Sequence, residues 1–275
     1  MINYNNHNIT GISYNNHSIK YVYGCGGNLV WSGSTEPHDY SKDYLSFVAK
    51  EDSYFGFHYA YLPTNLYFSI DGGSGWISLD NQTRQFTPLI RAGERIMWKG
   101  TLNPHDLVDQ TGGIGRFVSF NSNDEIMKGR FDIEGNVMSL MYSDDFSGQT
   151  SLAGEDYAFR YLFSGNTRLE EARNFVLPAT TLSDFCYNAM FADCASLSSA
   201  PELPAQTLTS SCYGRMFDNC ALLNNITCMA TDISVGSCTT QWVNGVAENG
   251  TFKKDPNMTD WTIDENGIPS GWQII

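Results

Sequence analysis

The sequence CYNAMFADCASL at residues 186–197 recurs as CYGRMFDNCALL at residues 212–223, a spacing of 26 residues. A less similar unit begins earlier, at Tyr157, and a degraded unit begins at Cys238. Self-similarity at a period of about 20 to 50 residues is typical of proteins whose units stack and bury each other's apolar faces. We therefore predict a stack of repeats over residues 143–247.

The spacing of apolar residues inside one unit predicts a short helix. They stand at i, i+3, i+4, i+7 and i+10, which is one face of a helix: Tyr187, Met190, Phe191, Cys194 and Leu197. Residues 198–203 follow and are closed by Pro204, which favours a strand and a turn over more helix. One short helix and one short strand per unit predict a leucine-rich-repeat solenoid.

Residues 44–142 contain short runs rich in aromatic and β-branched residues, separated by Gly, Asp, Asn and Pro. Runs of this kind at such intervals predict an antiparallel β-sandwich. They lie at residues 44–48, 54–57, 66–70, 95–98, 116–120, 128–133 and 137–140. The predicted fold class is therefore mainly β with short helices (α+β), in which a β-meander, a sandwich, a short solenoid and a β cap follow one another.

The two ends of the chain carry other patterns. The segment YNNHNI, which begins at Tyr4, recurs ten residues later as YNNHSI, with turn signals between short β-type segments. We predict a β-repeat attachment segment over residues 1–33, too short to stand alone, and a linker over residues 34–43. Residues 248–275 leave the repeat and predict a C-terminal cap with a hairpin turn at Asn266 and the following glycine.

Charge and hydropathy narrow the classes of partner. The 275 residues include 16 Lys and Arg against 30 Asp and Glu, a formal net charge of -14. No stretch concentrates basic residues, which argues against nucleic acid and anionic membranes as primary partners. No window reaches the roughly 18 to 20 apolar residues of a membrane span. The first residues lack the basic and apolar regions of a secretory signal, so we expect no signal-directed export.

Six of the seven cysteines fall between Cys186 and Cys238. No C-x-x-C pair occurs, and a spacing of eight within a unit is not that of a zinc site. We therefore predict buried, reduced thiols, with no metal and no cofactor. Two repeat columns contain five of them, Cys186, Cys212 and Cys238 in one and Cys194 and Cys220 in the other, and Cys228 lies outside both.

The sequence carries no G-x-S-x-G, H-E-x-x-H, Walker A or G-x-G-x-x-G motif at the start of a helix, and we predict no enzymatic activity. Residues 69–76, SIDGGSGW, resemble the Asp-box, S-x-D-x-G-x-x-W. In that motif the Asp and Ser side chains bond backbone amides of a hairpin turn and the Trp packs underneath. We interpret this single copy as a scaffold element.

The unit C-Y-x-x-M-F-x-x-C-x-S-L-x-x-A-P-x-L-P-A-x-T-L resembles the BspA-type (Treponema-like) leucine-rich repeat of proteins from gut Bacteroidetes and from the phages that infect them. The likeness covers residues 157–247 and extends into the tail through residues 250–272. Residues 12–23 are similar to N-terminal segments of predicted phage structural proteins from the same hosts. The resemblance implies display and adhesion rather than chemistry.

A virion protein is made in the cytoplasm and leaves by lysis, so it needs no export signal and keeps its thiols reduced. The first hypothesis is therefore a non-enzymatic phage virion protein: a fibre, decoration or tail-associated component. Other virion proteins would bind the N-terminal segment, and we expect a homo-oligomer, since trimers are common among fibres. Two alternatives stay open. One is a bacterial cell-surface adhesin, and the other is a carbohydrate-binding accessory module or a carbohydrate-active enzyme, with a cleft between two carboxylates about 5 to 10 Å apart.

By analogy with other solenoids, the repeat strands would face the ligand, a host-surface glycan or protein. Polar, neutral-to-acidic strands suit either partner. The candidate binding residues are Glu170, Glu171 and Arg173, then Ser198, Ser199 and Glu202, then Asn224, Asn225 and Thr227.

Overall fold

The chain divides into two compact units, Met1–Asp39 and Tyr40–Ile275. The computed structural model describes residues 38–58, 65–79, 86–103 and 129–275, together with the backbone of seven strands outside these ranges. The boundary between the units falls inside the predicted linker. Residues 34–37 of that linker, Cys25 and the side chains of the predicted attachment segment lie outside the described residues.

Six short strands form three antiparallel pairs in the first unit. In each copy of the ten-residue repeat the tyrosine pairs with the histidine of the same copy, Tyr4 with His7 and Tyr14 with His17. These pairs match the short β segments predicted for this region, but the described strands form three separate two-stranded sheets rather than the predicted meander. The strands are β1 (Asn3–Tyr4), β2 (His7–Asn8), β3 (Ile12–Tyr14), β4 (His17–Ile19), β5 (Tyr21–Tyr23) and β6 (Leu29–Ser32).

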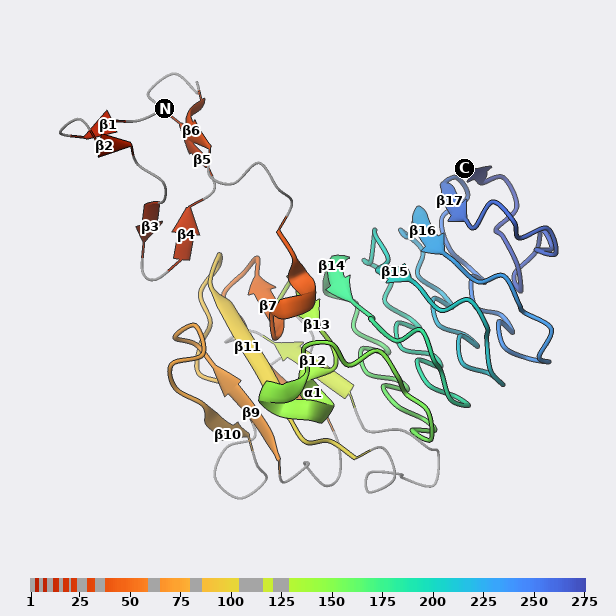
Figure 1. The fold of residues 1–275 in the computed structure, drawn as a ribbon, viewed down its shortest axis with the longest axis horizontal. Coiled ribbons are helices and arrows are strands. Elements are labelled where there is room, and N and C mark those ends of the chain that lie inside the picture. The colour runs from red at the N-terminus through yellow and green to blue at the C-terminus, as the bar shows by residue number, and fades with distance from the viewer. Residues whose placement is uncertain are drawn as a thin grey trace. The chain divides into compact units, whose positions relative to one another are not determined.

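A six-stranded mixed sheet, in the order β10-β9-β11-β7-β13-β14, forms the centre of the second unit (Figure 1). A separate sheet pairs β8 with β12. Residues 40–142 are termed the β-domain below. Its elements are the 3₁₀ helix η1 (Tyr40–Lys42), β7 (Leu45–Ala49), β8 (Tyr54–His58), β9 (Leu66–Ser69), β10 (Ile77–Leu79), β11 (Arg95–Gly100), β12 (Arg116–Phe120), β13 (Phe131–Asn136) and helix α1 (Ser139–Tyr142), which the 3₁₀ helix η2 (Ser143–Asp145) follows.

Six of the predicted strand-like runs coincide with β7, β8, β9, β11, β12 and β13, but the strand predicted at residues 137–140 is wrong. A turn and α1 occupy that position. Ser139 Oγ donates to the carbonyl of Trp98 at 3.0 Å and accepts from the N–H of Leu45 at 3.1 Å. These two bonds hold the start of the helix against the sheet. They join segments that are far apart in the sequence, so a local sequence pattern could not predict them.

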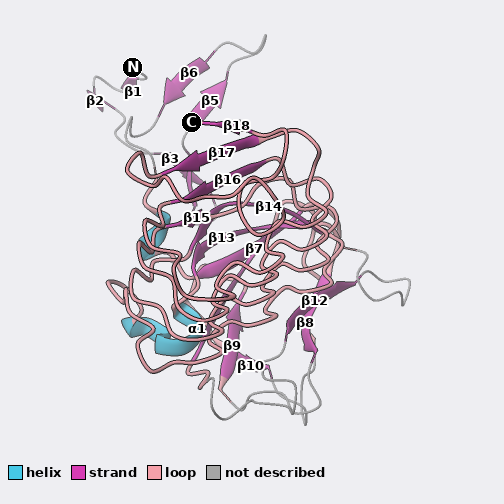
Figure 2. Cartoon of the chain, turned by 90° about the vertical axis from the view of Figure 1, so that its right-hand side faces the viewer, coloured by secondary structure: helices cyan, strands magenta, loops and turns pink. Residues whose placement is uncertain are grey.

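The sheet continues into the repeats. β13 pairs in parallel with β14 (Leu169–Val176), the first repeat strand, and Glu171 of β14 bridges to Ser199 in the next repeat. Beyond it β15 (Glu202–Leu203), β16 (Asn225–Cys228), β17 (Thr251–Lys254) and β18 (Gln273–Ile274) form a parallel ladder, and Figure 2 shows their arrows stacked in this order. The protein is thus mainly β, with mixed, open sheets and one short α-helix among the described residues.

The helix predicted in each repeat is wrong. Residues 184–193 form consecutive turns, in which Phe185, Tyr187 and Ala189 have φ angles of 59°, 58° and 50°. Left-handed φ at alternate residues is incompatible with a right-handed helix. The same alternation is found at residues 157–161, and we term such a segment the turn series of its repeat.

Half of the amide groups in a turn series bond within their own repeat, and half bond to the next one. Met190 N–H donates to the carbonyl of Tyr187 at 3.1 Å, three residues back, whereas Phe191 N–H donates to the carbonyl of Met216 in the next repeat at 2.9 Å. The alternation recurs in the neighbouring repeats. Because buried amides need partners, no repeat can satisfy its backbone alone.

Two columns of aromatic rings run through the stack. In one of them Phe163, Phe191 and Phe217 follow at centroid distances of 5.5 and 5.7 Å, with interplanar angles of 9°. Phe163 also lies 6.0 Å from Phe47 of β7, so the repeats and the β-domain share one hydrophobic core. The second column contains Phe159, Tyr187, Tyr213 and Trp242.

The six repeat cysteines are buried, as the sequence predicts. Cys194 and Cys220 donate their S–H groups to carbonyls of the preceding repeat, those of Phe163 at 3.1 Å and Phe191 at 3.0 Å. Burial raises the pKa of Cys186 and of Cys220 well above the usual thiol value. These thiols therefore behave as small core residues rather than nucleophiles.

The hairpin predicted for the cap is wrong. β18 pairs in parallel with β17 and continues the ladder, while Trp261 stacks on Trp242 with the ring centroids 5.4 Å apart. Trp272 covers Gly250, where an added Cβ would lie 2.6 Å from the indole ring, so glycine is required there. The cap is built by ring stacking and by extension of the ladder.

Substitution by glycine at Gln241 distinguishes the turn series from a helix. Gln241 is exposed and has a φ angle of 52°, which glycine adopts readily, whereas glycine in a helix would be destabilising. Left-handed φ costs a non-glycine residue about 1 kcal/mol, which offsets the entropy that glycine adds to the unfolded chain. We expect Gln241→Gly to change the free energy of unfolding by less than about 0.5 kcal/mol and Gln241→Val to lower it by roughly 1 to 2 kcal/mol, measured by denaturant titration.

The neighbouring residue, Thr240, is exposed and lies outside the left-handed region, so it provides the matched control. There Thr240→Gly should cost about 0.5 to 1 kcal/mol and Thr240→Val should be close to neutral. The same ranking of glycine and valine at both positions would contradict the alternating turns.

The hydroxyl groups of Tyr187 and Tyr213 are buried without a hydrogen-bond partner among the described residues. Burial raises the pKa of both phenols well above the usual value. An unpaired buried hydroxyl costs about 1 to 3 kcal/mol, and phenylalanine keeps the ring without it. We expect Tyr213→Phe to raise the free energy of unfolding by roughly 0.5 to 1.5 kcal/mol, while the control Tyr67→Phe, at a partly exposed ring, stays near zero. Destabilisation by Tyr213→Phe would show that the hydroxyl is bonded.

Candidate binding face of the repeats

Strands β14, β15 and β16, with the residues between them, bring most of the predicted binding residues to one side of the ladder. Along β16 Ile226 and Cys228 are buried, whereas Asn225 and Thr227 are partly exposed, so side chains alternate between core and surface. Outward side chains of successive strands then stand in rows, about 4.8 Å apart. We term the outward side the repeat face; it contains Glu171, Arg173, Ser198, Glu202, Asn225 and Thr227, with Ser199 covered beneath it, whereas the side chains of Glu170 and Asn224 are not part of it.

Five of these residues form a connected chain across three repeats. Glu171 Oε1 accepts from Ser198 Oγ at 2.9 Å, and Glu171 Oε2 lies 3.8 Å from Arg173 Nη2. Arg173 Nη2 donates to Ser199 Oγ at 3.0 Å, and Asn225 Nδ2 reaches the same oxygen at 3.4 Å. Ser199 is only 2% exposed. Each side chain is held by its neighbour, so the row presents a defined arrangement of donors and acceptors.

Glu170 turns toward the β-domain instead. Its carboxylate lies 3.0 Å from Lys50 Nζ and 3.0 Å from Arg130 Nη1, and Lys50 Nζ also lies 3.0 Å from Asp132 Oδ1. Burial alone would raise the pKa of Glu170, but hydrogen bonds from Lys50 and Arg130 outweigh it and lower the pKa. For Asp132 burial dominates and raises the pKa. Sequence reasoning missed both cations, because no repeat spacing points to them.

A second row on the repeat face contains Glu202, Thr227 and Lys253, which are aligned in register on β15, β16 and β17. Lys253, and Thr251 beside Asn225 in the first row, were not among the predicted residues. Thr251 lies 26 residues after Asn225, and Lys253 lies 26 residues after Thr227, so the repeat period could have predicted both.

Asn224 connects neighbouring repeats through hydrogen bonds of its backbone. Its N–H donates to the carbonyl of Ser198 at 3.3 Å, and its carbonyl accepts from the N–H of Thr251 at 2.9 Å. The residue is exposed and precedes β16. Its contribution is to join consecutive repeats, and its side chain belongs to neither row.

The carbohydrate-active alternative requires two carboxylates across a cleft. Asp132 Oδ1 and Glu170 Oε2 each lie 3.0 Å from Lys50 Nζ, so the two oxygens are at most 6.0 Å apart. Their pKa values shift in opposite directions, as those of a catalytic acid and base do. The ammonium group of Lys50, however, lies 3.0 Å from an oxygen of each carboxylate and forms an ion pair with both. The geometry is that of an ion-pair cluster.

The Asp-box has the turn geometry that its residues predict. Asp71 Oδ1 accepts from Ser69 Oγ at 2.6 Å and from the N–H of Gly75 at 2.8 Å. These hydrogen bonds, that of Ser69 above all, lower the pKa of Asp71. Trp76 packs edge-on against Tyr44 with the ring centroids 4.9 Å apart. The motif fastens the β9–β10 turn to the β-domain, in agreement with a scaffold role.

Within the described ranges, no group of three His, Cys, Asp or Glu side chains is placed to hold a metal ion. No helix in those ranges has the length and apolarity to span a bilayer. Comparison with protein-family models, with curated proteins and with solved structures finds no match.

The Glu170 cluster joins the repeats to the β-domain and should contribute to stability. We expect Glu170→Gln to lower the free energy of unfolding by roughly 1 kcal/mol at neutral pH, since it removes two partly buried ion pairs. Because the folded pKa of Glu170 is lowered, this difference should be present above the ordinary carboxyl pKa and vanish as the pH falls through the folded one. Denaturant titrations across that pH range measure it.

The matched control is Glu202→Gln, at an exposed carboxylate that makes no ion pair with the described part of the chain. It should change stability by less than about 0.5 kcal/mol at any pH. Equal effects of the two substitutions would contradict a joining role for Glu170.

Proposed function

We propose that this chain is a non-enzymatic structural protein of a phage virion, a fibre, decoration or tail-associated component, whose repeat face attaches to the host surface. The observation that carries the proposal is the row from Glu171 through Ser199 to Asn225. Its donors and acceptors are positioned before any ligand arrives. A surface of this kind loses little conformational entropy on binding.

The ladder that bears the row also supports a display role. The proposal treats the repeats as a leucine-rich-repeat solenoid and the β-domain as a sandwich that spaces them from the particle. One parallel strand per 26-residue unit and the separate β8–β12 sheet support these two readings. The division into two compact units supports an N-terminal segment that binds other virion proteins, in a homo-oligomer such as a trimer.

The chemistry of the face limits the partner to a neutral or mixed-charge surface. It combines amide and hydroxyl groups with the ion pair of Glu171 and Arg173, whose side chain is 68% exposed, and with the single charges of Glu202 and Lys253. A host-surface glycan and a protein loop both fit such groups. A bacterial cell-surface adhesin would use the same face, so the location of the chain separates the two proposals.

Location is tested first, in particles purified on a density gradient from lysates of the strain that encodes the chain. We expect peptides of the chain to co-sediment with intact particles and to be detected by mass spectrometry in constant ratio to the capsid protein. Recovery in the envelope of unlysed cells would favour the adhesin and overturn the virion proposal.

Attachment is tested with the purified full chain as a competitor of particle adsorption to host cells. The double substitution Arg173→Ala and Asn225→Ala should weaken the competition by roughly tenfold or more, because it removes both side chains that anchor Ser199. Arg91→Ala, at an exposed ion pair of the β-domain, is the matched control and should compete as the wild type does. Equal competition by all three proteins would remove the repeat face as the binding surface.

A further inference from the structure

The last strand of the ladder has an open edge. Gln273 and Ile275 donate their N–H groups to the carbonyls of Gly250 at 2.8 Å and Phe252 at 3.0 Å. In a parallel pair alternate residues face the partner strand, so the N–H and C=O of Ile274 point away from β17. No described strand lies on that side of β18. One donor and one acceptor are therefore available at Ile274 for a further strand.

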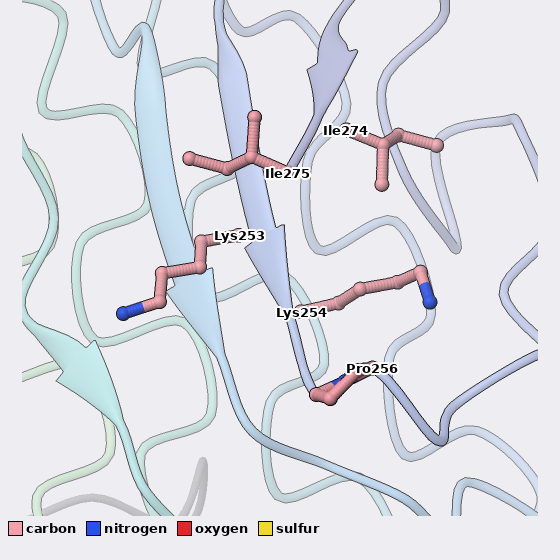
Figure 3. A pocket seen from close by; sticks show the side chains of 5 residues that line it. All are labelled: Lys253, Lys254, Pro256, Ile274 and Ile275. Atoms are coloured by element: carbon pink, nitrogen blue, oxygen red, sulfur yellow. The ribbon is translucent and has the colours of Figure 1, made fainter.

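An apolar hollow adjoins this edge. Its volume is about 280 Å³, and Figure 3 shows the side chains of Ile274 and Ile275 with Pro256 around it. Ile274 is 43% exposed and Ile275 is 60% exposed, which is unusual for aliphatic side chains beside a strand edge. A hollow of this size accommodates one or two aliphatic side chains, and their burial would remove exposed apolar surface from water.

The charge beside the hollow is uncompensated. Lys254 Nζ donates to the carbonyls of Met258 at 2.5 Å and Asp255 at 3.4 Å. Lys253 makes no ion pair or hydrogen bond through its side chain with any residue that the structure describes, and in Figure 3 the two lysines point in opposite directions. Among the described residues an exposed ammonium without a carboxylate is notable, because the whole chain carries a net charge of -14. It complements a carboxylate on a partner.

We propose that this end of the ladder is a strand-addition site for an extended, acidic segment of another protein. The segment would pair with Ile274, place an aliphatic side chain in the hollow and direct a neighbouring Asp or Glu side chain toward Lys253. Backbone bonds supply affinity in this mode of recognition, and alternate side chains supply specificity. A second copy of this chain that offered its own β18 fits less well, because β18 has no acidic side chain to face Lys253.

The test uses the full, ¹⁵N-labelled chain and two synthetic peptides, acetyl-Thr-Val-Glu-Val-Thr-amide and its counterpart with Lys in place of Glu. The acidic peptide is expected to shift the amide resonances of Ile274 and of residues 251–254. The basic peptide should bind about three to five times more weakly, the range of an exposed ion pair. Lys253→Glu should reverse the preference between the two peptides.

Ile274→Pro removes the outward N–H and leaves the bonds to β17 in place, so it should abolish the binding of both peptides while the rest of the spectrum is retained. The control Ile263→Ser changes an exposed aliphatic residue of the same cap that does not line the hollow, and should bind normally. If Ile274→Pro perturbs the fold, Lys253→Glu carries the test alone.

Three results would overturn the proposal. One is the absence of shifts at Ile274 with the acidic peptide at millimolar concentration, and another is equal binding of the two peptides. The third is a concentration-dependent dimer in sedimentation experiments that Ile274→Pro dissociates, because a second copy would then occupy the edge. Strand addition does not depend on a place in a virion, so its failure leaves the proposed function untouched.

Discussion

Each repeat depends on hydrogen bonds that it cannot make by itself. In the turn series alternate N–H groups point along the stack and find their carbonyls in an adjacent repeat, in most cases the next one. The cap meets the same requirement for the last one: Val243 N–H donates to the carbonyl of Glu265 at 3.3 Å, and Gln241 N–H donates to Asn266 Oδ1 at 2.7 Å. The aromatic columns add apolar burial to the stack. Its direction and spacing, however, follow from these backbone bonds.

The local sequence pattern correctly predicted the repeat period, most of the strands and the burial of the thiols. All three features depend on which side chains face the core. The prediction of a helix in each repeat was wrong. The spacing of Tyr187, Met190, Phe191 and Cys194 reports burial on one side, and both a helix and a series of turns produce it. The deciding bonds join residues 25 or more positions apart, which a local window does not contain. The hairpin predicted for the cap was wrong for the same reason, because β18 pairs with the distant strand β17.

The residues of the candidate site also fall into those that the sequence could predict and those that it could not. Repeat spacing places Asn225 and Thr227 on one face, and it could have added Thr251 and Lys253. Lys50 and Arg130 were beyond its reach, because they approach Glu170 only through the parallel pairing of β13 with β14. Residues that belong to the repeat are therefore readable from the sequence. Those that the β-domain contributes depend on how the two parts meet.

The ladder has a supported end and an exposed end. β14 is bonded to β13 within a six-stranded sheet, whereas among the described strands β18 pairs with β17 alone. Tension applied at the exposed end would load the bonds of one strand pair at a time, as in a zipper, and each released strand would leave the next as the new end. Mechanical failure would begin at the tip and advance repeat by repeat toward the β-domain, whose central strands are bonded on both sides.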